Sequence, residues 1–147
     1  MTRLELAEKI KLAKAKKGVS WADIAKKVGR SEVWTTAALL GQMTMDPKEA
    51  NAAAKVLSLS KDEEFLLTQI PYKGSLPAAV PTDALIYRFY EVVSVYGTTF
   101  KAVIEDKFGE GIMSAIDFSC DIERVPDPKG DRVKVTMNGK FLPYKKY

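Results

Sequence analysis

Three residues in the second half of the chain could do chemistry: Arg88, Glu91 and Ser114. Arg88 and Glu91 lie three residues apart in YRFYEVVSVYGTT, a stretch that predicts a helix, so their side chains share one side and can touch. An arginine fork that one carboxylate uses only in part suits a small planar anion. Ser114 follows the glycine-flanked GEGIM, where a loop becomes a strand, so its hydroxyl could point at a ligand.

Each of these residues also has a simpler interpretation. Spacing alone favours an ordinary salt bridge within the helix for Arg88 and Glu91, and a serine at a strand start is usually structural. However, aromatic and β-branched residues surround the pair, which predicts that it is desolvated, and buried charge is costly unless it is compensated. Cys120 falls on the apolar face of its strand, which favours a packed thiol over a nucleophile.

The residue types limit the possible chemistry. The 147 residues include one cysteine and no histidine. The absence of histidine removes Ser-His-Asp and Cys-His nucleophilic machinery and every His-ligated metal site. A single cysteine excludes an intramolecular disulfide and a multi-cysteine zinc site. An enzyme of this composition must work with Arg, Lys, carboxylates, hydroxyls and backbone dipoles.

Charge and hydropathy give expectations about location and partners. No apolar run approaches the roughly 20 residues that span a bilayer. The N-terminal MTRLELAEKIKLAKAKK is amphipathic and lacks the apolar core and cleavage site of a signal peptide. These features predict a cytoplasmic protein that has no membrane contact. The formal net charge of +4 is concentrated in the first half, which could attract anionic partners.

The first seventy residues predict five short helices. Each begins after a capping residue, and these are Thr2, Ser20, Ser31, Asp46 and Ser60. Glycines 18, 29 and 41 end the first three helices. The Pro- and Gly-rich segment 71–83 predicts a linker. We therefore expect a helical bundle at 1–75 and a catalytic and oligomerisation domain at 76–147.

The second half predicts two helices and two or three short strands, and so an α+β protein. One helix begins after Thr82 or Asp83 and breaks near Gly97, and a second ends at Gly109. Alternation with a period of two predicts strands in SAIDFSCDIERV and RVKVTMNGKFLPY, and Asn138-Gly139 predicts a type I′ hairpin. A lone ribbon is marginal in water. Either another subunit completes this half, or it packs on the N-terminal helices.

The segment SWADIAKKVGRSEVWTTAALLG has the rhythm of a helix-turn-helix motif, which predicts a bundle of lambda-repressor-like type. A recognition helix normally presents Arg, Lys, Asn or Gln to the major groove. Here the second helix offers Glu32, Trp34, Thr35 and Thr36. A DNA-binding regulator is therefore the alternative function, and nucleic acid is not the expected partner.

Several motifs resemble the cyanase (cyanate hydratase, cyanate lyase) family. YRFYEVVSVYGTTFKAVIEDKFGEGIMSAIDF is similar to the signature region of that family. AKKGVSWADIAKKVG, WTTAALLGQ, IPYKG and the closing GKFLPYKKY are similar to the same family in the same order, so the resemblance covers essentially the whole chain.

The resemblance implies a reaction that needs no metal and no organic cofactor, and it implies a site. In the family, cyanate and the co-substrate bicarbonate give carbamate and carbon dioxide, and carbamate breaks down to ammonia and a second carbon dioxide. The catalytic Arg, Glu and Ser of the family fall on Arg88, Glu91 and Ser114. The family fold implies a C-terminal half interlocked with its dimer partner, a decamer of five such dimers, and active sites at subunit interfaces.

Overall fold

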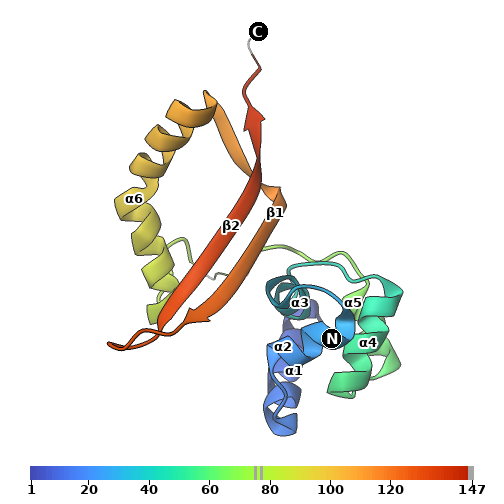
Figure 1. Ribbon diagram of the computed structural model, residues 1–147. Helices are drawn as coiled ribbons and strands as arrows, with labels where there is room; N and C mark the ends of the chain where they lie inside the picture. Colours follow the sequence, from blue (N-terminus) through green and yellow to red (C-terminus); the bar gives the residue numbers. More distant parts are fainter. Residues whose placement is uncertain (75, 77, 146–147) are drawn as a thin grey trace. The chain divides into compact units, whose positions relative to one another are not determined.

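The computed structural model describes residues 1–74, 76 and 78–145 (Figure 1). Six helices are followed by two strands in this part of the chain. The elements are α1 (Arg3–Lys17), α2 (Trp21–Val28), α3 (Glu32–Leu39), α4 (Pro47–Leu57), α5 (Lys61–Leu67), α6 (Ala84–Phe108), β1 (Gly111–Val125) and β2 (Arg132–Pro143). The predicted α+β class and the five N-terminal helices are confirmed.

The predicted capping residues open the first five helices. The side chains of Thr2, Ser20, Ser31, Asp46 and Ser60 each accept a hydrogen bond from the backbone N–H three residues on. In all but α3, an acidic residue at that third position accepts from the backbone of the cap, which completes a capping box. These caps satisfy backbone donors that the first turn of a helix leaves free.

The five helices enclose a core of their own. Leu6, Ile10, Ile24, Ala38, Leu39, Met45, Ala50, Ala53, Leu57 and Leu67 form one buried cluster. Small alanines on α4 let its neighbours pack closely, while the leucines and isoleucines supply most of the buried apolar surface. The side chain of Arg3 donates to the carbonyl oxygens of Leu66, Ala38 and Met43, at 2.6, 2.9 and 2.9 Å. Arg3 therefore links the C-terminal ends of α3 and α5 and the segment that follows α3.

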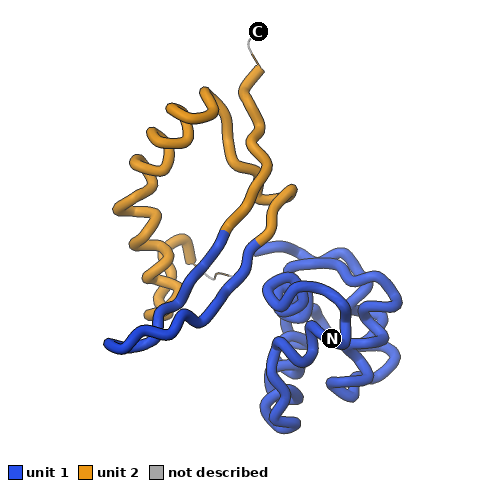
Figure 2. The backbone as a smooth tube through the Cα atoms, viewed as in Figure 1, with its two compact units in different colours: residues 1–75, 120–136 blue, residues 76–119, 137–147 orange. Residues whose placement is uncertain are grey.

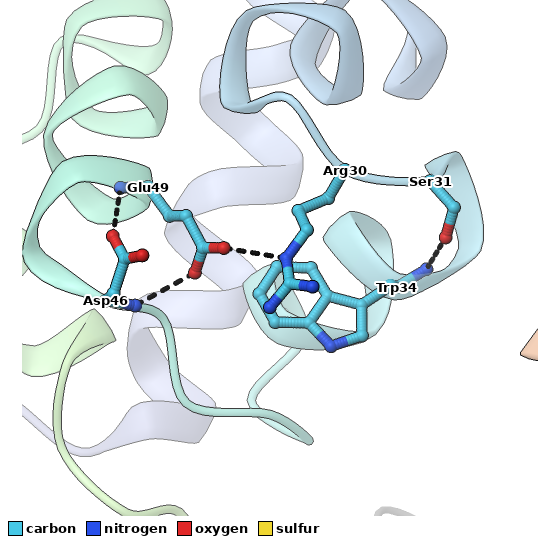
Figure 3. A network of polar contacts seen from close by, with 5 residues as sticks. All are labelled: Arg30, Ser31, Trp34, Asp46 and Glu49. Atoms are coloured by element: carbon cyan, nitrogen blue, oxygen red, sulfur yellow. Dashed lines mark hydrogen bonds and ion pairs between the residues drawn. The ribbon is translucent and has the colours of Figure 1, made fainter. Parts of the chain in front are cut away.

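A polar network joins the α2–α3 turn to the start of α4 (Figure 3). Arg30 Nε donates to Glu49 Oε1 at 2.7 Å, and its guanidinium lies over the Trp34 ring, 4.3 Å from the centroid. The other oxygen of Glu49 accepts from the backbone N–H of Asp46 at 2.9 Å. Glu49 is 9% exposed, so this shared use of its carboxylate compensates its burial.

The chain forms two compact units (Figure 2). Residues 1–75 and 120–136 belong to the first unit, and residues 76–119 and 137–147 belong to the second. The described residues between α5 and α6 form no helix or strand; the predicted linker 71–83 lies here, with Ser75 and Pro77 outside the described residues. Among the described residues, no helix is both long and apolar enough to cross a membrane.

Helix α6 differs from its prediction. It is continuous for 25 residues, so the break expected near Gly97 is wrong. One glycine costs a helix only about 1 kcal/mol, which is too little to end a 25-residue helix by itself. Within the single chain, no residue of α6 is buried. Its exposed apolar side chains include Leu85, Phe89, Tyr90, Val92, Val93, Val95, Tyr96, Phe100 and Val103.

Strands β1 and β2, of 15 and 12 residues, pair as one antiparallel ribbon (Figure 1). Strand β1 begins at Gly111, three residues before the predicted start. The segment 126–131 turns the chain, as expected. The hairpin predicted at Asn138-Gly139 is wrong, because β2 runs straight through it. A Cβ atom on Gly139 would lie 2.4 Å from the carbonyl oxygen of Ser114. Gly139 is therefore needed for close approach of the strands and not for a turn.

This contact gives a first prediction. Gly139→Ala forces the two strands apart at Ser114 and should destabilise the protein by about 1–3 kcal/mol, the usual cost of overpacking. Asn138→Ala is the control, because Asn138 is exposed in the middle of a strand and should change stability little. Thermal unfolding followed by circular dichroism measures both. An Asn138→Ala variant as unstable as Gly139→Ala would favour a hairpin at these residues.

A second prediction concerns pH. The hydrogen bond from Lys9, with help from the backbone of Ser60, lowers the pKa of Glu63 below its ordinary 4.5. A carboxyl whose pKa is lowered on folding stabilises the protein above its unfolded pKa and loses that effect as pH falls through the folded value. The stability supplied by the Lys9–Glu63 pair between α1 and α5 should therefore disappear below about pH 4.5.

The variant Glu63→Gln isolates this effect, because glutamine keeps the capping box and removes the charge. It should cost about 1 kcal/mol at pH 7, since Lys9 is half-exposed, and should flatten the loss of stability in acid. Glu8→Gln is the matched control, because Glu8 pairs with Lys11 on the open surface of α1. Equal acid sensitivity in Glu63→Gln and the parent would contradict the assignment.

Candidate active site

Helix α6 places Arg88 and Glu91 on one side, as their spacing predicts. Arg88 Nη1 donates to Glu91 Oε2 at 2.5 Å. The rings of Tyr87 and Tyr90 stack beside them, with centroids 5.7 Å apart. This contact uses one nitrogen of the guanidinium, so the remaining donors of the fork are those that a planar anion would engage.

The pair is exposed within one subunit. The side chain of Arg88 is 68% exposed and that of Glu91 is 42% exposed, so the predicted desolvation is wrong for the single chain. The hydrogen bond with Glu91, and then its negative charge, raise the pKa of Arg88 above its already high ordinary value. Arg88 therefore keeps its positive charge at every pH at which the protein is folded.

Ser114 lies near the start of β1 and is 6% exposed. Its Oγ accepts from the backbone N–H groups of Ile116 and Asp117, both at 3.0 Å. These two amides, two and three residues further along, bend the strand locally around the serine. Across the ribbon, the Ser114 carbonyl meets Gly139. The serine is therefore held on both sides by backbone, which fixes its position well.

The three residues are not joined within one subunit. No hydrogen bond or ion pair among the described residues links Arg88 or Glu91 to Ser114. The C-terminal end of α6 contacts the C-terminal end of β2, where the ring of Phe108 stacks on that of Phe141 with centroids 5.1 Å apart. A site that used all three residues would need a further connection, which a second copy of the chain could supply.

The backbone groups around Ser114 were not predicted from the sequence. Nothing in SAID signals that the amides of Ile116 and Asp117 turn back to the serine, because amide orientation leaves no trace in residue types. The glycine at 139 did carry a signal, but its neighbour Asn138 made it resemble a turn. Cys120 is half-exposed in the single chain, so the packed thiol predicted there is not formed by this subunit alone.

Across residues 1–74, 76 and 78–145, no group of three or more Cys, Asp or Glu side chains is placed to hold a metal ion. The candidate residues themselves are an arginine, a glutamate paired with it and a serine, which suit hydrogen bonding to an anion.

The fold and the candidate site thus define a class: an α+β protein whose candidate polar groups are suited to bind a small anion. Two family models match it: "Cyanate hydratase, N-terminal" over residues 3–71 and "Cyanate lyase C-terminal domain" over residues 78–146. Together these matches cover most of the chain. The chain belongs to the cyanate hydratase (cyanate lyase) family.

Relatives of this family match along their full length. The cyanate hydratases of Variovorax paradoxus and Methylibium petroleiphilum are 62% and 61% identical over 147 residues, which is 100% of this chain and of each relative. A crystal structure of cyanase from T. urticae superposes with a TM-score of 0.80 at 37% identity, covering 94% of this chain and 96% of that one. These relatives do not support the alternative hypothesis that the protein is a DNA-binding regulator.

Proposed function

We propose that this protein is a cyanate hydratase, a lyase that decomposes cyanate with the help of bicarbonate. The observation that carries the proposal is the 62% identity to a cyanate hydratase over all 147 residues. The residues that the family uses, Arg88, Glu91 and Ser114, are all present. The exposed pair on α6 and the backbone-held serine on β1 are chemically suited to bind a small anion.

The proposed reaction joins two anions. An oxygen of bicarbonate attacks the carbon of cyanate, and the resulting dianion loses carbon dioxide and takes up one proton to give carbamate. Carbamate then takes up a second proton and separates into ammonia and carbon dioxide. Two like charges repel in water, so the enzyme must supply preorganised positive potential and hydrogen-bond donors. Holding both anions in place also removes much of the entropic barrier.

The residues take distinct roles in this proposal. Arg88 clamps the oxygens of the dianion with the donors that Glu91 leaves free, and Ser114 donates a further hydrogen bond. Glu91 orients the guanidinium through their 2.5 Å contact, with proton handling as its second possible role. No metal and no organic cofactor takes part, because the charge that develops is negative and arginine can meet it.

The assembly belongs to the same proposal. Residues 1–75 form the helical bundle, of helix-turn-helix type, and residues 76–147 form the catalytic and oligomerisation domain. The C-terminal half interlocks with a partner subunit, five dimers form a decamer, and the sites lie at subunit interfaces. The exposed apolar side chains of α6 support this, because a helix that is apolar nearly all round is normally buried. The cytoplasmic location remains a prediction from the sequence.

The experiment is an assay of ammonia release. Purified protein in carbon-dioxide-free buffer should release ammonia when cyanate and bicarbonate are both present, and should release none with either anion alone. Native mass in the same buffer tests the decamer. An inactive protein that instead binds duplex DNA with steep salt dependence would overturn the proposal in favour of the regulator.

Arg88→Lys tests the clamp. Lysine keeps the charge but presents a point donor in place of a planar fork, so kcat/KM should fall by about 10²-fold or more. Glu91→Gln keeps the shape of its side chain and should lower kcat/KM less, with an unchanged pH profile if Glu91 only orients Arg88. An Arg88→Lys enzyme with near-normal turnover would contradict the clamp, and a shifted pH profile in Glu91→Gln would assign proton handling to the glutamate.

A further inference from the structure

The hydroxyl of Ser114 has its accepting capacity occupied before any ligand binds. A serine hydroxyl can accept two hydrogen bonds and donate one. The N–H groups of Ile116 and Asp117 donate to Oγ at 3.0 Å each, which accounts for both accepting positions. Among the described residues no acceptor is found for the O–H group itself, although Ser114 is 6% exposed. A nearly buried hydroxyl with an uncommitted proton is therefore left.

We infer that Ser114 is fixed as a hydrogen-bond donor, and that the backbone N–H groups of Ile116 and Asp117 are the positioning groups that fix it. The acceptor would be an anionic oxygen of the carboxylate class, on bicarbonate or on the dianion formed from it. This inference rests on the proposed function and deepens it. It also removes these two amides from the set of donors available to substrate, because both are committed to Oγ.

The same geometry opposes a nucleophilic role. In that role Oγ would attack the carbon of cyanate while the O–H proton passed to the cyanate nitrogen, and the resulting anion would take up a second proton from solvent to give a carbamoyl ester of Ser114. The attack needs a free lone pair on Oγ and a base that accepts the proton. Both lone pairs already accept hydrogen bonds, and no side-chain base contacts Ser114 among the described residues. The chain also contains no histidine that could serve.

The arrangement suits an anion for an electrostatic reason. Two N–H dipoles that point at Oγ draw electron density toward that oxygen and polarise the O–H bond, so the hydroxyl donates more strongly. The donor is also preorganised: its neighbours are backbone atoms of a paired ribbon, and the Ser114 carbonyl is held against Gly139. Little reorganisation is then needed as negative charge develops on the bound oxygen.

Three substitutions at Ser114 separate a donor from a nucleophile. Ser114→Ala removes the donor and should lower kcat/KM by about 10²-fold or more. Ser114→Thr keeps the hydroxyl and should retain much more activity than alanine. Ser114→Cys replaces it with a weak donor that is a better nucleophile, so activity should fall nearly as far as with alanine. The residual activity of Ser114→Ala should keep the parent's pH profile, because a donor that does not ionise leaves it unchanged.

A second measurement follows the positioning amides without using activity. Hydrogen–deuterium exchange, read by mass spectrometry on peptides that cover 115–118, should become faster in Ser114→Ala, where both amides lose their acceptor. Exchange should stay close to that of the parent in Ser114→Thr. Ser119→Ala is the matched control, because Ser119 is exposed on the same strand. Circular dichroism and native mass establish that each variant folds and assembles as the parent does.

The outcomes are distinguishable. A Ser114→Cys enzyme as active as the parent would overturn the inference, as would a carbamoyl group mapped to Ser114 after exposure to cyanate. Unchanged exchange at 115–118 in Ser114→Ala would overturn the role of the two amides. In each of these cases an active parent enzyme leaves the proposed function intact. A parent that releases no ammonia from cyanate and bicarbonate would overturn the proposed function, and this inference with it.

Discussion

The second compact unit cannot bury its own apolar surface, and much of the protein's behaviour depends on that constraint. Helix α6 runs for 25 residues without one buried side chain, whereas the first five helices enclose a cluster that includes Ile10, Ile24 and Leu67 at 0% exposure. Exposed apolar surface on this scale is unfavourable in water. The first five helices therefore have a core of their own, whereas the unit that carries Arg88, Glu91 and Ser114 leaves apolar surface exposed that the proposed oligomer would cover.

This constraint is consistent with the absence, among the described residues, of a hydrogen bond or ion pair between Ser114 and the Arg88–Glu91 pair. A charged pair such as Arg88 and Glu91 can stay hydrated until a partner covers it, so folding of the chain does not have to bury an incomplete site. Burial of charge is costly unless other groups compensate. The two halves also differ in charge. Residues 1–75 contain thirteen basic residues (Lys and Arg) and nine acidic residues (Asp and Glu), while residues 76–147 contain ten basic and ten acidic residues. The second half has no excess charge, so attraction for anions there must come from the placement of individual groups.

The sequence predicted what is decided locally and was wrong where distant contacts decide. Capping residues such as Thr2 and Asp46 act on the next three residues, so their pattern identified all five N-terminal helices. Gly97 and Asn138-Gly139 carry equally strong local signals, yet α6 and β2 continue through both. At Gly139 the reason is the neighbouring strand, which no local pattern records. Arg88 and Glu91 could be paired from their spacing, whereas their exposure depends on subunits that a single sequence does not place.

A catalyst that joins two anions without a metal has to obtain its electrostatic stabilisation from groups that are oriented before the substrates arrive. In the proposed reaction, Arg88 would meet this requirement through its contact with Glu91, which occupies part of the guanidinium fork and orients the remaining donors. In the same proposal, Ser114 would meet it through backbone contacts, because the amides of Ile116 and Asp117 donate to its oxygen and leave only a donor. The free-energy cost of ordering these donors is then met when the protein folds, and not when the substrates bind. An anion that enters gains hydrogen bonds without reorganising the protein, which is the condition under which a few neutral and cationic groups can stabilise a dianionic transition state.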